Sequence, residues 1–241
     1  MTSTPVTPTA ATARPTDRTA LLAVTATQFV SMFGAFFVLS AAIDWPASLD
    51  LPPERALPLV HAQASGVALG YTLYFLSAFL LVPLAVLARR VLETIGARGA
   101  LLEAATALGV LAGALKLLGI VRWLVAMPAL ASAYASGDAG TREIVAVTYR
   151  TLNDYAGGVG EVLGVSLFSG LWTVLVGLLL TRLPRGRALG VTGVVSGALL
   201  LAGLAGVYGA DLGPILTVSG IAWQIWLVAL AVTLLRAPNR A

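Results

Sequence analysis

Six long apolar runs fill most of the chain and constrain its fold more than any other feature. Five contain no charged residue, and the sixth is interrupted only by Lys116 and Arg122. The runs are Ala20–Ile43, Ala62–Ala88, Ala104–Ala135, Val162–Thr181, Ala188–Ala210 and Leu212–Leu235. Because a helix needs about 20 apolar residues to cross the hydrocarbon core of a bilayer, the chain is predicted to be all-α. We expect a polytopic transmembrane bundle of six helices.

The composition agrees with a membrane protein and excludes several kinds of chemistry. Charged residues make up only 11% of the 241 residues, whereas soluble domains carry about 25%. There is no cysteine, so disulfides, iron–sulfur clusters and cysteine nucleophiles are excluded. His61 is the only histidine, and no zinc-binding spacing is present. No cofactor or metal is predicted.

The arginines fall at alternate gaps between the apolar runs, and this alternation predicts the topology. One side of the membrane receives ten arginines and three acids, whereas the other receives three arginines and seven acids. Cytoplasmic loops are enriched in positive charge, so both termini are predicted to be cytoplasmic. The high pI of 9.9 follows from this asymmetry rather than from one basic face, and a nucleic-acid partner is therefore excluded.

The segments outside the runs suggest three parts and one extra helix. Residues 1–19 are rich in Ser, Thr and Pro and are predicted to form a disordered cytoplasmic tail. The transmembrane domain then covers residues 20–236, and residues 237–241 form a second cytoplasmic tail. Residues 141–156 have the pattern of a short amphipathic helix capped by Thr141. That helix is either a separate element on the outer membrane surface or an outward extension of the fourth span.

Three charged residues fall within the predicted spans and form the basis of a candidate site. At about 1.5 Å per residue, Lys116 lies past the midplane, and Arg122 and Glu161 share a height near the outer edge. Glycines flank all three at helical spacing, and small residues mark close helix contacts in lipid. An unpaired charge at the bilayer centre costs about 2.5–3.5 kcal/mol on insertion scales. We therefore expect these side chains to face protein.

Two interpretations of these charges remain open. In the first, Arg122 and Glu161 form a structural pair that fixes the register of two helices. In the second, the charges belong to an outward-facing polar cluster that binds a lipid, a small hydrophobic molecule, or a membrane-protein partner such as a second copy of the chain. The residues assigned to this cluster are Lys116, Arg122, Asn153, Asp154, Glu161, His61 and Gln224. The lipid bilayer is a partner in both interpretations.

Two alternative functions use the same residues. A membrane-embedded enzyme with terpene-cyclase-like chemistry would use Glu161 or Asp154 as its acid, since residues seven apart share one face of a continuous helix. A proton-coupled transporter would use Lys116 and Glu161, although the two halves of the sequence show no matching repeat. Nucleophile-elbow, P-loop and dinucleotide motifs are absent, so no catalytic residue is assigned.

Several short stretches are shared with a known family. They are Arg122-Trp123, Pro128–Ala131, Asn153–Gly157, Gly160–Gly164, Leu180–Arg185 and Ala188–Val191. Through these stretches, mainly over spans three to six, the chain resembles an uncharacterised family of bacterial multi-pass integral membrane proteins, catalogued as a domain of unknown function. The resemblance implies a membrane architecture and carries no established activity. The heavy use of alanine, glycine and arginine is also typical of GC-rich bacteria, and we expect a location in the bacterial plasma (inner) membrane.

Overall fold

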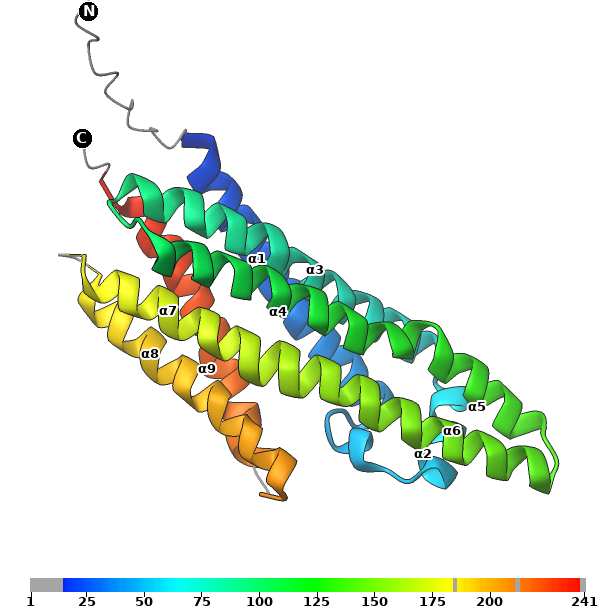
Figure 1. Ribbon diagram of the computed structural model, residues 1–241. Helices are drawn as coiled ribbons and strands as arrows, with labels where there is room; N and C mark the ends of the chain where they lie inside the picture. The colour runs from blue at the N-terminus through cyan, green and yellow to red at the C-terminus, as the bar shows by residue number, and fades with distance from the viewer. Residues whose placement is uncertain (1–14, 184–185, 211–212, 239–241) are drawn as a thin grey trace, which may run out of the picture.

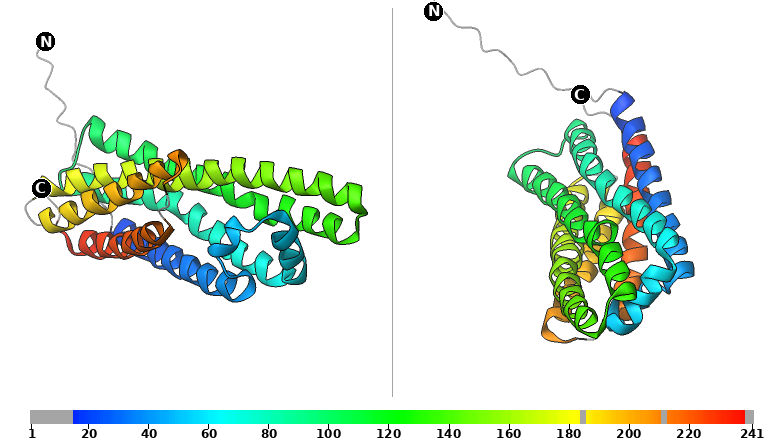
Figure 2. Two further views of the ribbon diagram at one scale, coloured as in Figure 1. Left: turned by 90° about the horizontal axis from the view of Figure 1, so that it is seen from below. Right: turned by 90° about the vertical axis from the view of Figure 1, so that its right-hand side faces the viewer.

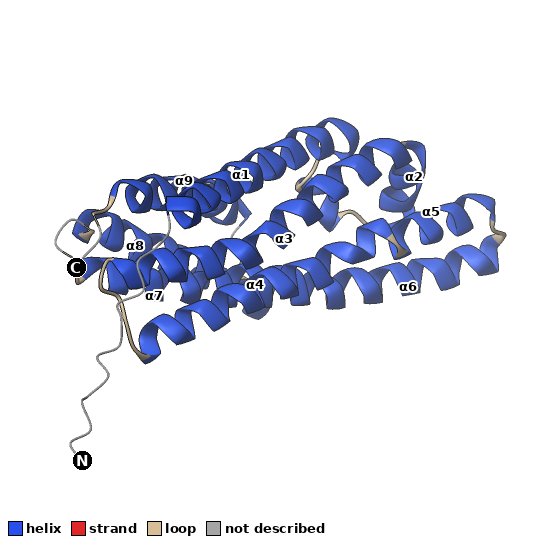
Figure 3. Ribbon diagram, turned by 90° about the horizontal axis from the view of Figure 1, so that it is seen from above, coloured by secondary structure: helices blue, strands red, loops and turns tan. Residues whose placement is uncertain are grey.

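A computed structural model describes residues 15–183, 186–210 and 213–238, and every regular element within these residues is helical (Figure 1, Figure 3). The elements are α1 (Pro15–Ile43), η1 (Ala47–Asp50), α2 (Pro53–Ala62), α3 (Ala64–Thr94), α4 (Ala100–Leu124), α5 (Ala126–Ser136), α6 (Ala139–Gly157), the π-helical segment η2 (Gly158–Ser169), α7 (Gly170–Thr181), α8 (Arg187–Ala202), η3 (Gly203–Tyr208) and α9 (Gly213–Arg236). Within the described part of the chain, six helical segments are long and apolar enough to cross a membrane. The predicted all-α bundle with six spans is confirmed.

The spans follow the predicted apolar runs, and their ends differ from the predicted ends at several places. Helix α1 begins at Pro15, so residues 15–19 belong to the helix rather than to the predicted tail, and residues 1–14 lie outside the described residues. The third run is divided at Val125, where a backbone with φ −118° and ψ −61° separates α4 from α5. Helix α9 ends at Arg236, where the transmembrane domain was predicted to end.

The spans pack side by side along one elongated bundle (Figure 2). Helix α1 packs on α3, α3 on α4, α4 on η2, and α7 on α8, while α9 packs on both α8 and α1. Helix α1 begins and α9 ends at one end, which we call the terminal end. The opposite end, where α5 turns into α6, is called the hairpin end. Helix α8 packs closely on α7 at Gly190, because a Cβ there would lie 2.7 Å from the carbonyl oxygen of Gly177.

The hairpin made by α4–α5 and α6–α7 is much longer than a bilayer is thick. The continuous helical segment Ala139–Thr181 has 43 residues, or about 60 Å, against a hydrocarbon core of about 30 Å. Helix α6 continues into η2 without a break and lies in line with α7 in Figure 1. Residues 141–156 therefore extend the fourth span, and the alternative of a separate surface helix is wrong.

Two helices at the hairpin end begin at residues that the sequence analysis did not choose. Helix α6 is capped by Asp138, whose carboxylate accepts a hydrogen bond from the backbone N–H of Thr141 at 2.8 Å. Hydrogen bonds from the Thr141 side chain and backbone lower the pKa of the Asp138 carboxyl. Helix α2 begins at Pro53, because proline is favoured in the first turn, where its missing N–H has no helical partner to lose.

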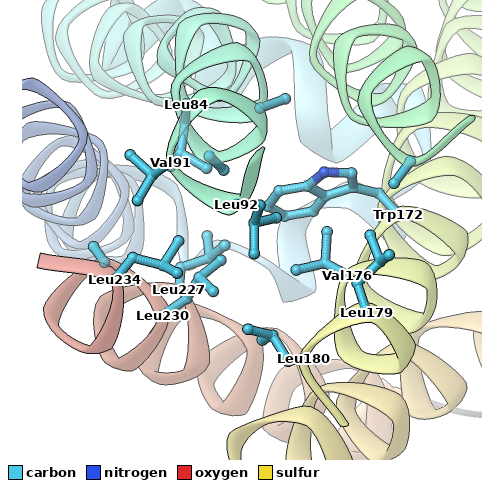
Figure 4. Packing of buried hydrophobic residues seen from close by; sticks show 14 of the residues in the cluster. Leu84, Val91, Leu92, Trp172, Val176, Leu179, Leu180, Leu227, Leu230 and Leu234 are labelled. Atoms are coloured by element: carbon cyan, nitrogen blue, oxygen red, sulfur yellow. The ribbon is translucent and has the colours of Figure 1, made fainter. Parts of the chain in front are cut away.

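The apolar interior consists of two clusters stacked along the bundle. The cluster near the terminal end surrounds Trp172 (Figure 4), whose ring meets those of Trp223 and Trp226 edge to face at 6.5 and 6.2 Å. The cluster near the hairpin end includes Tyr71 and Tyr149. Helices α1, α3 and α4 contribute to both clusters, and between the clusters α1 and α4 bury polar side chains that include Gln28 and Lys116. This division positions the candidate site residues.

Candidate functional site

Arg122 and Glu161 meet near the hairpin end of the bundle. The Arg122 side chain, on α4, is only 7% exposed, whereas the Glu161 side chain, on η2, is 58% exposed. The Arg122 Nη2 atom lies 3.7 Å from Glu161 Oε1, and its Nη1 atom donates to the carbonyl oxygen of Gly119 at 2.8 Å. Direct hydrogen bonds between such charges are about 2.7–2.9 Å long. The two residues thus form an open ion pair that leaves hydrogen-bonding capacity on both sides.

Glycines bring α4 and η2 close enough for this pair to form. A Cβ on Gly119 would lie 2.5 Å from the Cα of Gly160, and a Cβ on Gly157 would lie 3.4 Å from the Arg122 guanidinium. The backbones of α4 and η2 are therefore almost in contact at Gly119, one helical turn before Arg122 in the chain. The helical spacing of these glycines in the sequence signalled this contact, because small residues mark close approaches in membranes.

Two tyrosines complete the site, and the sequence analysis did not assign them to it. The ring of Tyr71, on α3, stacks on Trp123 with centroids 4.6 Å apart and planes 4° from parallel. Tyr71 and Tyr149, on α6, lie near enough to Arg122 to interact with its charge. Both hydroxyl groups are buried without a hydrogen-bond partner, as is Nε of Arg122. Buried polar atoms are normally paired, so this grouping is unusual.

Asn153 is the third predicted residue that belongs to this site. It lies one turn after Tyr149 on α6, and its side-chain amide donates to the carbonyl oxygen of Leu49 at 3.4 Å, while its Oδ1 atom is buried and unpaired. We call Arg122, Glu161, Tyr71, Tyr149 and Asn153 the hairpin-end site.

The other predicted residues lie elsewhere, so the sequence grouped residues that the fold separates. Asp154 is exposed on α6, and His61 is exposed in the last turn of α2. Lys116 and Gln224 are buried between the two apolar clusters, each 4% exposed. In the described part of the chain, no three His, Asp or Glu side chains are grouped so that they could hold a metal ion.

The hairpin-end site offers both hydrogen-bond donors and hydrogen-bond acceptors. The guanidinium and the tyrosine hydroxyls can donate hydrogen bonds, and the Glu161 carboxylate and the Asn153 oxygen can accept them. Hydrogen-bond donors and acceptors, and one charge of each sign, therefore lie near the hairpin end of the bundle. Such a region matches a polar group that itself carries both signs.

The fold and these charges define a polytopic helical membrane protein with a polar site near one end of its bundle. A family model described as a domain of unknown function, DUF4386, matches residues 19–232. The chain belongs to this family, as the short shared stretches indicated. Comparison with curated proteins and with solved structures found no match.

Proposed function

We propose that the protein binds the polar head of an amphipathic molecule, with a phospholipid as the principal candidate, at the hairpin-end site. In this proposal the protein resides in the bacterial plasma membrane, with its termini in the cytoplasm and the hairpin end outside. The distribution of arginines supports this orientation, since cytoplasmic ends are enriched in positive charge. The described arginines near the terminal end are Arg18, Arg89, Arg90, Arg98, Arg182, Arg187 and Arg236.

The observation that carries the proposal is the open pair of Arg122 and Glu161 beside unpaired buried polar atoms. Its two charges are 3.7 Å apart, and Arg122 Nε and two tyrosine hydroxyls have no protein partner. A zwitterionic head would place its phosphate against Arg122 and its ammonium against Glu161. Both new contacts would be charge-assisted hydrogen bonds, which are the stronger kind.

The depth of the site also suits a lipid head. Glu161 lies 20 residues before Thr181, the last residue of α7, and 20 helical residues span about 30 Å, the thickness of the hydrocarbon core. Tyr155 and Tyr208 are highly exposed near the same level, and tyrosine is enriched where acyl chains meet lipid heads. Glu161 is therefore expected at the outer interface.

Native mass spectrometry of the protein in nanodiscs tests the proposal with three defined lipids. Phosphatidylethanolamine, with a hydrogen-bonding ammonium, should bind more tightly than phosphatidylcholine or phosphatidylglycerol. Removing one charge-assisted contact costs about 1.5–3 kcal/mol, so Glu161→Gln should weaken phosphatidylethanolamine binding about 10- to 150-fold. Arg150→Gln is the matched control, because Arg150 pairs with Glu54 on the surface of the same end of the bundle. This variant should leave the affinity for phosphatidylethanolamine unchanged.

Other results of the same experiment would support the alternatives. Tyr149→Phe removes an unpaired hydroxyl without disturbing the ion pair, so it separates lost binding from lost folding. Equal retention of all three lipids by wild type and by Glu161→Gln would refute lipid-head recognition. Conversion of the bound molecule to a product of different mass would favour an enzyme that uses Glu161 or Asp154. A second protein, or a second copy, retained in place of lipid would favour a partner module.

A further inference from the structure

A polar layer crosses the bundle between its two apolar clusters. Its central residue is Lys116, the only lysine of the chain, which is 4% exposed. Gln28 on α1 and Gln224 on α9 are 1% and 4% exposed, and the Oε1 atoms of both are buried without a hydrogen-bond partner. Three helices thus contribute a buried polar side chain to the middle of the membrane.

Contacts made by neighbouring residues show which helices surround Lys116. The Lys116 Nζ atom lies 5.2 Å from the centre of the Trp223 ring, and Gln224 is the next residue on α9. Across the bundle, the Ser77 hydroxyl on α3 donates to the carbonyl oxygen of Tyr74 at 2.7 Å and lies 3.8 Å from the sulfur of Met32, and Gln28 precedes Met32 by one turn. Gln224 is thus next in the chain to a residue that contacts Lys116, and Gln28 lies one turn from a contact between α1 and α3.

Lys116 has no ion-pair or hydrogen-bond partner among the described residues. Its ammonium group instead lies over two aromatic rings, those of Trp223 and, at 5.9 Å, Tyr74. The carboxylate of Glu161 is paired with Arg122 instead. An unpaired ammonium deep in a membrane is costly. Whether Lys116 is charged therefore depends on whether water and protons reach it from either side.

The two sides of Lys116 differ strongly. Toward the hairpin end, the half-buried Tyr74 lies near Lys116 and also near enough to Glu161 and Arg122 to interact with their charges. Glu161 in turn is 58% exposed. Toward the terminal end, Lys116 is followed by the apolar cluster around Trp172 (Figure 4), and α4 carries no ionisable residue between Glu103 and Lys116.

We infer that Lys116 is a proton-binding site that exchanges protons with the hairpin-end side of the membrane only, past Tyr74 and Glu161. The ammonium loses one proton to that aqueous phase and becomes a neutral amine, and it regains one by the reverse step. The ionisable groups near this route are Tyr71 and Tyr74 on α3, Arg122 on α4, Glu161 on η2 and Asp50 on η1. Helices α1 and α9 present only neutral polar groups, Gln28 and Gln224, and the described part of the chain places no ionisable side chain of α7 there.

The single lysine makes this inference directly testable in proteoliposomes. Reductive methylation with formaldehyde and a borane consumes the neutral amine, and digestion with mass spectrometry measures the modification of Lys116. With the pH set separately on the two sides, the rate at Lys116 should rise about tenfold for each unit of pH on the hairpin-end side. The pH on the terminal-end side should have no effect.

Two reporter variants identify the sides without assuming a topology. In a Lys116→Arg background, Arg142→Lys places the only lysine at the hairpin end, and Arg187→Lys places it at the terminal end. Lys116 should follow the same compartment as the Arg142→Lys reporter, and Tyr74→Phe should slow its reaction. The inference would be overturned if the Lys116 rate followed the pH of the compartment that contains the Arg187→Lys reporter. It would also be overturned if the rate followed the pH of both compartments or of neither. These results do not depend on lipid binding at the hairpin-end site.

Discussion

Replacing Gly119 by alanine should force α4 and η2 apart. The new Cβ would lie 2.5 Å from the Cα of Gly160 and 2.9 Å from two further backbone atoms. Carbon atoms pack best at about 3.5–4.0 Å, so the helices must separate by about 1 Å, and backbone atoms cannot rotate away. Overpacking of this kind typically costs about 1–3 kcal/mol, partly offset by the better helix propensity of alanine, which is worth about 1 kcal/mol.

Gly158→Ala is the matched control, because it lies in the same segment, η2, and a Cβ there would meet nothing within 4 Å. That variant should be neutral or more stable by up to about 1 kcal/mol. Equilibrium unfolding by SDS in mixed micelles measures both, and Gly119→Ala should be the less stable by at least about 1 kcal/mol. Equal stability of the two variants would refute the close approach of α4 and η2, and with it the placement of Arg122 beside Glu161.

Three further predictions concern polar contacts. Arg122→Gln and Glu161→Gln should each lower stability in the same unfolding assay, and the double variant should cost less than their sum by about 0.5–3 kcal/mol; strict additivity would exclude pairing. Arg150→Ala should change stability by less than about 1 kcal/mol, since its bridge to Glu54 is exposed, and a larger loss would show that α2 depends on this bridge. Because the pKa of Asp138 is lowered in the folded state, its cap should be fully effective above the ordinary pKa of aspartate, about 4, and should be lost as the pH falls through the lowered value. Hydrogen exchange at the Thr141 amide should therefore be slower in the wild type than in Asp138→Ala at neutral pH but equal to it in strong acid; a difference that persists in acid would contradict the assignment of the cap.

The hairpin end shows where sequence patterns stop being decisive. The amphipathic pattern of residues 141–156 is the same for a surface helix and for an extended span, because the period of a helix does not specify what covers its faces. Packing of α6 on α5, together with its unbroken continuation into η2, decided the matter. The cap moved from Thr141 to Asp138 for a similar reason, since both residues suit an N-cap and the turn after α5 selects one.

The candidate site shows the same limit for residues within the spans. Depth along a helix follows from counting residues, so Arg122 and Glu161 were placed at one height. Tyr71 and Tyr149 were not assigned, because nothing local distinguishes a tyrosine that faces Arg122 from one that faces lipid. Lys116 was grouped with Arg122, but its ammonium group lies over the rings of Tyr74 and Trp223 and belongs to the polar layer between the two apolar clusters.

The amino-acid sequence by itself determined that this chain forms six membrane-spanning helices, because crossing lipid demands long apolar helices whose backbone groups are satisfied internally. It also determined where close helix contacts were possible, through glycines at helical spacing. Only the tertiary structure decided which faces meet, and hence which buried charges pair and which remain alone. The physical reason is that lipid and protein interiors are equally apolar, so hydropathy specifies the span but not the neighbour of each side chain.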